Sequence, residues 1–124
     1  MEILVPISLG ELYDKISILE IKLSMIKDEE KLKNIKKEYL SLINISLHFS
    51  IEEELYQELK DKNKDLLIVE DKLRIKEKNK TFDDEFIQLA RSVYFLNDKR
   101  SQIKREINIK TASNIIEEKS YEQY

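Results

Sequence analysis

Apolar residues recur at alternating spacings of three and four between positions 86 and 107. The seven positions of this pattern are Phe86, Leu89, Val93, Leu96, Arg100, Ile103 and Ile107. The spacing is that of a coiled-coil stripe, and it predicts one long helix over 82–110. Arg100 is the one charged residue in the stripe. A guanidinium there needs a partner or access to water, because burying an unpaired charge is costly.

A second strong pattern lies near the N-terminus, where Ser8 and Glu11 have the spacing of a capping box. It predicts a helix over 8–27 with two apolar stripes. One stripe is Leu9, Leu12, Ile16, Leu19, Leu23 and Ile26, and the other is Ile18, Ile21 and Met25. A helix that is apolar on two sides has neighbours on both, so we expect it at the centre of the fold.

The segment before this helix is short and apolar, and Pro6 bars a helix there. We expect residues 1–7 to be extended. A lone strand is not stable unless it packs or pairs. The segment therefore lies across the bundle or pairs with the same segment of a second subunit.

Two further apolar patterns lie in the middle of the chain, with Asp28 and a capping box opened by Ser50 at their starts. We divide the chain, as a single domain of residues 1–124, into an extended segment 1–7, helices 8–27, 29–48, 51–78 and 82–110, and a tail 111–124. A short polar turn joins the last two helices, which favours an antiparallel hairpin. The expected fold class is all-α, a helical bundle built on this long antiparallel helical hairpin with a short extended N-terminal segment.

The composition supports the all-α class and limits the kinds of functional site that the chain can form. The 124 residues include one glycine and one proline, too few for the turns of an all-β fold. Cysteine is absent and His48 is the single histidine, which excludes disulfides, thiolate catalysis and histidine-rich metal sites. Carboxylate pairs such as Glu11 with Asp14 have the spacing of magnesium ligands in helical pyrophosphohydrolases. Since 25 acidic residues produce such pairs by chance, we expect no metal and no cofactor.

Charge and hydropathy also bear on partners. The net charge is −3 and no block of five like charges occurs, so we expect no nucleic-acid binding. No apolar run approaches the roughly 20 residues that span a bilayer, so we expect no membrane insertion. The first residues lack the pattern of a signal peptide, which indicates a cytoplasmic protein.

Arginine is rare, yet three of the four arginines lie in the predicted helix 82–110. Arginine suits bidentate binding of anions. Candidates for a ligand- or anion-binding site are Arg91, Tyr94, Asn97, Asp98, Arg100 and Arg105. The alternative, which we favour, is that Arg100 and Asn97 fix the register and orientation of the helices through buried polar bonds.

The tail is polar in composition but carries apolar anchors at Ile115, Ile116 and Tyr124. It could dock on its own bundle or on a partner. The candidates for such docking are Glu118, Lys119, Ser120 and Tyr121.

Four stretches of the chain resemble a small bacterial family of unknown function. They are LGELYDKISILEIK at 9–22, LARSVYFLND at 89–98, IKREIN at 103–108 and EEKSY at 117–121. The resemblance implies a stand-alone, mostly helical protein whose relatives occur joined to or near glycan-building enzymes. It supplies no established activity and no catalytic residue.

Together these patterns favour a non-catalytic interaction or oligomerisation module, because no nucleophile–base pair is identifiable. We expect a homodimer, since two long helices and a two-sided first helix offer more apolar surface than one small bundle needs. A further protein partner is also expected. The alternative is a protein, with or without catalytic activity, that binds a small ligand or an anion on the polar face of the helix 82–110.

Overall fold

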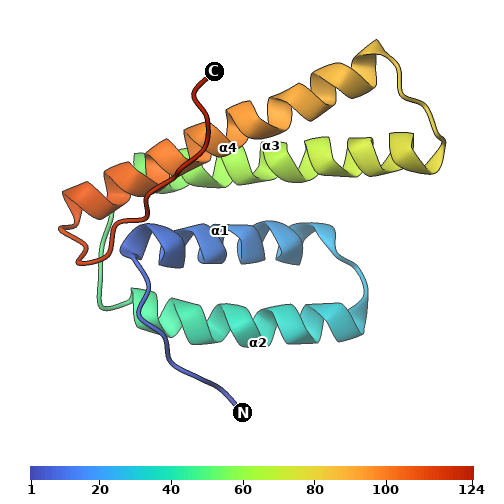
Figure 1. Ribbon diagram of the computed structural model, residues 1–124. Coiled ribbons are helices and arrows are strands. Elements are labelled where there is room, and N and C mark those ends of the chain that lie inside the picture. Colours follow the sequence, from blue (N-terminus) through green and yellow to red (C-terminus); the bar gives the residue numbers. More distant parts are fainter.

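The structure is a computed structural model that describes all 124 residues, and it contains four helices and no strand (Figure 1). The helices are α1 (Leu9–Met25), α2 (Glu29–Ser46), α3 (Glu53–Lys78) and α4 (Asp84–Lys110). The long helices α3 and α4 form an antiparallel hairpin, and α1 and α2 form a second hairpin that lies against it (Figure 1). The predicted all-α bundle built on a long antiparallel hairpin is confirmed.

Helix α1 is the central element, as its two apolar stripes predict. It contacts all three other helices, whereas α2 contacts α1 alone. The buried core is formed by Leu12, Tyr13 and Ile16 of α1, Leu55 and Leu59 of α3, and Ile103 and Ile107 of α4. The apolar stripe of α4 thus reaches the core near its C-terminal end, where it packs on α1.

Helix α2 forms an outer layer in which no residue is fully buried. Its half-buried Tyr39, Leu42 and Ile43 pack on the core. Leu47, the C-cap of α2, lies outside this packed side, since 76% of it is exposed.

Helix starts follow local capping chemistry at three of four positions. Ser8 Oγ, Asp28 Oδ1 and Asp83 Oδ1 each accept a hydrogen bond from a backbone N–H of the first turn. The predicted capping box at Ser50 is wrong, because α3 begins at Glu53 and its N-cap Glu52 makes no side-chain cap bond. The Glu52 carboxylate instead accepts from Lys110 Nζ at 3.2 Å.

The C-terminus of α4 is closed by two tight backbone bonds. Ala112 N donates to Ile109 O at 3.2 Å and Ser113 N donates to Asn108 O at 2.8 Å. This is the Schellman pattern, and Ala112 occupies its left-handed position with a φ of 52°. The motif turns the chain sharply, so the tail runs back over α4 (Figure 1).

Candidate functional site

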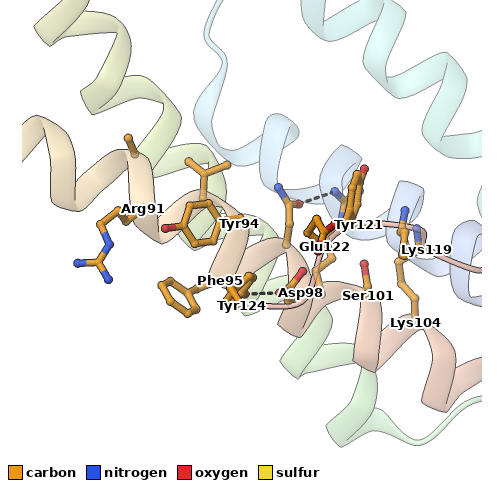
Figure 2. A pocket seen from close by; sticks show the side chains of 14 residues that line it. Arg91, Tyr94, Phe95, Asp98, Ser101, Lys104, Lys119, Tyr121, Glu122 and Tyr124 are labelled. Carbon is orange, nitrogen blue, oxygen red and sulfur yellow. Dashed lines mark hydrogen bonds between the residues drawn. The ribbon is translucent and has the colours of Figure 1, made fainter.

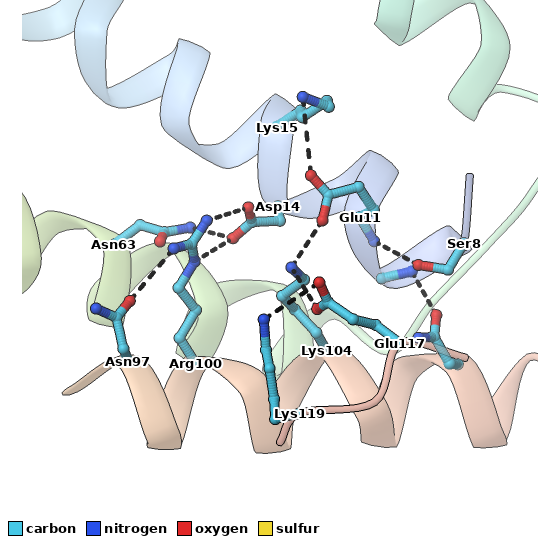
Figure 3. A network of polar contacts seen from close by, with 12 residues as sticks. Ser8, Glu11, Asp14, Lys15, Asn63, Asn97, Arg100, Lys104, Glu117 and Lys119 are labelled. Atoms are coloured by element: carbon cyan, nitrogen blue, oxygen red, sulfur yellow. Dashed lines mark hydrogen bonds and ion pairs between the residues drawn. The ribbon is translucent and has the colours of Figure 1, made fainter. Parts of the chain in front are cut away.

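The most deeply buried charge of the protein is the carboxylate of Asp14, which is 1% exposed. Arg100 donates to both of its oxygens, from Nε at 2.8 Å and from Nη2 at 2.5 Å. Asn63 Nδ2 donates to the same carboxylate at 2.9 Å and to Ser17 Oγ at 2.8 Å. These four residues, called here the Asp14 network, join α1, α3 and α4 (Figure 3).

The electrostatics of the Asp14 network favour the charged forms of Asp14 and Arg100. Burial raises the pKa of Asp14, but the hydrogen bonds from Arg100 and Asn63 and the Arg100 charge outweigh it, so the pKa lies below its usual value. The same hydrogen bond raises the pKa of Arg100. The carboxylate therefore stays ionised at neutral pH, in spite of its burial.

A second ion pair lies one turn further along α4. Lys104 Nζ donates to Glu11 at 2.7 Å and to Glu117 of the tail at 3.4 Å (Figure 3). Burial lowers the pKa of Lys104, but the bond to Glu11 and the acidic charges nearby raise it overall. The capping box predicted for Ser8 and Glu11 forms on the serine side, while the Glu11 carboxylate binds Lys104 and, at 3.7 Å, Lys15.

Helices α1 and α4 approach most closely at Gly10. Its backbone N–H donates to Asn108 Oδ1 at 2.7 Å, which satisfies a free amide in the first turn of α1. A Cβ atom at this position would lie 2.5 Å from Lys104 O and 2.9 Å from Asn108 Oδ1. The single glycine of the chain thus stands where a side chain would collide with the backbone of α4.

A groove of about 750 Å³ follows the outer side of α4, between this helix and residues 119–124 of the tail. Figure 2 shows the side chains that line it. Five of the six predicted ligand-binding residues lie there: Arg91, Tyr94, Asn97, Asp98 and Arg100. The sixth, Arg105, lies outside this groove and pairs with Glu118 at 2.9 Å. We call this cavity the α4–tail groove.

Aromatic rings fill one end of the α4–tail groove (Figure 2). The ring centroids of Tyr94, Phe95 and Tyr124 lie 4.9 to 5.2 Å apart. The Tyr124 hydroxyl donates to Asp98, and this bond raises the pKa of Tyr124 to about 12. The end of the tail is thereby held against α4 by side chains.

Four cationic side chains line the α4–tail groove, and they differ in whether an acidic residue of the protein is paired with them. Arg100 binds Asp14, Lys104 binds Glu11, and Lys119 pairs with Glu117 at 3.2 Å. Arg91 forms no ion pair and no side-chain hydrogen bond in the protein. Of the four cations, Arg91 alone is therefore available to an anion without displacing an acidic partner.

The predicted tail residues have mixed positions. Lys119 and Tyr121 line the α4–tail groove, and Glu118 holds Arg105. Ser120 is exposed and makes no contact of this kind. The tail is thus placed on its own bundle through side chains at several points.

Comparison with known proteins places the chain in a family. Residues 3–124 match a family of unknown function, DUF6165. The chain belongs to this family. A comparison with curated proteins and one with solved structures found no match. Membership of DUF6165 confirms the expectation of a family without an assigned activity, and any functional argument must come from the site itself.

Two further features of this DUF6165 chain concern metal ions and membranes. No group of three or more His, Cys, Asp or Glu side chains is placed to hold a metal ion. None of its helices combines the length and apolar character needed to cross a membrane.

Sequence reasoning missed several residues that form the polar contacts. Asn63, Lys104 and Asn108 are buried although all three are polar. A usable signal existed for Asn63, because the stripe of α3 that contains Leu59 and Leu66 also passes through position 63. Lys104 and Asn108 carry no such signal, since they flank the stripe of α4.

Proposed function

We propose that this DUF6165 protein is a non-catalytic interaction module that associates with a second copy of itself. The supporting observation is that the conspicuous arginines of α4 are largely engaged within the chain. Asp14 binds Arg100 and Glu118 binds Arg105, as expected for groups that fix packing. Internal pairing weakens the case for an anion site built on the same residues.

Apolar surface adds a second line of support. Helix α2 has no fully buried residue, and Ile45 near its end and Phe49 just after it remain exposed. Monomeric proteins rarely leave large apolar patches uncovered, because burying apolar surface contributes roughly 25 cal/mol per Å². Exposed apolar side chains at the end of α2 are what an association surface requires.

The test is the mass of the protein in solution. Light scattering after size-exclusion chromatography at tens of micromolar should give twice the mass of one chain, and dilution should shift the equilibrium toward the single chain. A mass of one chain over the whole concentration range would contradict the proposal.

The pathway we propose is glycan or cell-envelope biosynthesis in the cytoplasm of a bacterium. Its support is the sequence resemblance alone. Affinity capture from the native organism should enrich enzymes that build glycans. Enrichment that is equal for an unrelated helical bait would argue against this assignment.

A second candidate function is binding of a small ligand or anion, and the α4–tail groove favours it. A volume of about 750 Å³ suits a small molecule, and Arg91 is free to bind its charge. Titration calorimetry with inorganic phosphate should then show saturable binding. Arg91→Gln should abolish this binding, and Arg74→Gln, which changes an exposed arginine of α3, should not. Absence of saturable binding would refute an anion site.

A further inference from the structure

Three strongly exposed apolar side chains follow one another in the N-terminal segment, residues 2–5. The exposed fractions are 75% for Ile3, 91% for Leu4 and 62% for Val5. The segment is extended, and no backbone N–H or C=O within it forms a backbone hydrogen bond. It therefore combines free strand edges with uncovered apolar side chains.

An apolar groove lies beside this segment. Its volume is about 620 Å³, and Leu12, Leu42, Ile45 and Phe49 contribute to its wall. The groove lies between the segment, the N-terminal end of α1 and the C-terminal half of α2. The segment leaves the bundle on the side of α2, away from α4 (Figure 1). The segment and the C-terminal half of α2 thus line one largely apolar groove.

The backbone groups and side chains of this surface indicate which kind of partner would bind to it. A helix could cover the side chains but would leave the N–H and C=O groups of the segment unpaired, whereas a strand satisfies both. An anionic membrane is a poor match, because Lys15 is the one basic residue that lines the groove, against Glu2 and Glu38. The occupant that fits is an apolar strand.

We propose that residues 2–5 pair as an antiparallel strand with the same residues of a second copy. This inference rests on the proposed function and names the surface through which the module associates. The segment is an apolar strand with a free edge, so the same segment of a second copy can pair its backbone groups and cover its side chains. Glu2 and Lys15 border the surface with opposite charges, which favours self-association. Pro6 has no N–H, so the pairing ends there.

Two-fold symmetry makes this proposal specific. When two identical antiparallel strands are related by a two-fold axis, one residue lies directly opposite its own copy. Its Cα atom lies about 4.5 to 5.5 Å from the Cα atom of that copy. The residues on either side lie diagonal to their copies, at roughly 7 to 8 Å. A disulfide needs a Cα separation below about 7 Å, so one position can form it and its neighbours cannot.

The experiment uses single cysteines in the full chain, which has none of its own. Ile3→Cys, Leu4→Cys and Val5→Cys are each oxidised at tens of micromolar, and the disulfide-linked dimer is measured on a non-reducing gel. Folding is not at risk, because all three side chains lie outside the core. Leu40→Cys, on the exposed side of α2, is the matched control, since that leucine is 59% exposed.

We expect one of the three N-terminal variants to cross-link at least tenfold faster than the other two and than Leu40→Cys. Similar rates at all three positions, or no cross-link at any, would overturn the strand pairing. The light-scattering mass of the unmodified protein is measured in parallel. A dimer that lacks the cross-linking pattern refutes this surface but leaves the proposed function standing, whereas a monomer refutes both.

Discussion

The two sides of α1 are built in different ways. Toward α4, polar bonds accompany the apolar packing: Gly10 N donates to Asn108, and Asp14 is held by Arg100. Toward α2, contact is made by half-buried apolar side chains, with a single polar bond in which Tyr39 donates to Glu20 at 3.0 Å. Directional bonds define one alignment of α1 on α4, whereas the α1–α2 contact depends on apolar area and a short connection. The position of α1 relative to α4 is thus fixed by directional bonds, whereas its position relative to α2 can vary more.

Arg100→Leu should produce the largest effect of any change that tests this contrast. It leaves the buried Asp14 carboxylate without its cation, so we expect a loss of about 3–5 kcal/mol in the free energy of unfolding. Urea denaturation measures the loss. The double variant Asp14→Leu/Arg100→Leu should recover more than half of it, because the buried carboxylate is removed together with its cation and Asn63 keeps its bond to Ser17.

A matched control for this variant is Arg91→Leu. Arg91 is exposed and unpaired, so its free energy of unfolding should change by less than about 0.5 kcal/mol. Equal effects at positions 91 and 100 would show that the Asp14 network does not stabilise the fold.

Gly10→Ala should destabilise the protein by roughly 1–3 kcal/mol, because the new methyl group meets the backbone of α4 and forces the helices apart. The sign is informative, since alanine is favoured over glycine in an ordinary helix by about 1 kcal/mol. Thermal unfolding followed by circular dichroism provides the measurement. Asn34→Ala on the exposed side of α2 is the control and should be neutral or slightly stabilising.

The pH dependence of stability should report the Asp14 network. Since the pKa of Asp14 is lower in the folded than in the unfolded protein, its contribution is fully present above the ordinary value of 3.8 and is lost as the pH falls through the folded pKa. Urea midpoints measured between pH 5 and pH 2 should therefore decline. The decline should be shallower in Asp14→Asn, and an unchanged slope would contradict this assignment.

Tyr39→Phe should have the smallest effect, at most about 1 kcal/mol, because the Tyr39–Glu20 bond is partly exposed. The same urea titration measures it. A loss comparable to that of Arg100→Leu would show that the two sides of α1 are equally specific.

The sequence predicts the elements of this fold better than their contacts. Four helices follow from apolar spacing, and the caps at Ser8 and Asp28 follow from local chemistry. The partners of Asp14 do not, because Asn63 and Arg100 lie 49 and 86 residues away. A buried carboxylate and a solvated one look alike until the chain is folded. The same limit applies to the candidate site. Five predicted residues of α4 line one groove, as their shared helix allows, but Arg100 among them mainly binds the buried Asp14.

The bond between Gly10 and Asn108 has a consequence for the order in which the protein folds. The two residues are 98 positions apart, so α1 leaves the ribosome long before its partner is synthesised. The hairpins α1–α2 and α3–α4 can form from local contacts, but docking them must wait for nearly the whole chain. During that interval Asp14 and the apolar faces of α1 are uncovered. The central helix α1 is therefore the first helix to be synthesised and the last to gain all of its contacts.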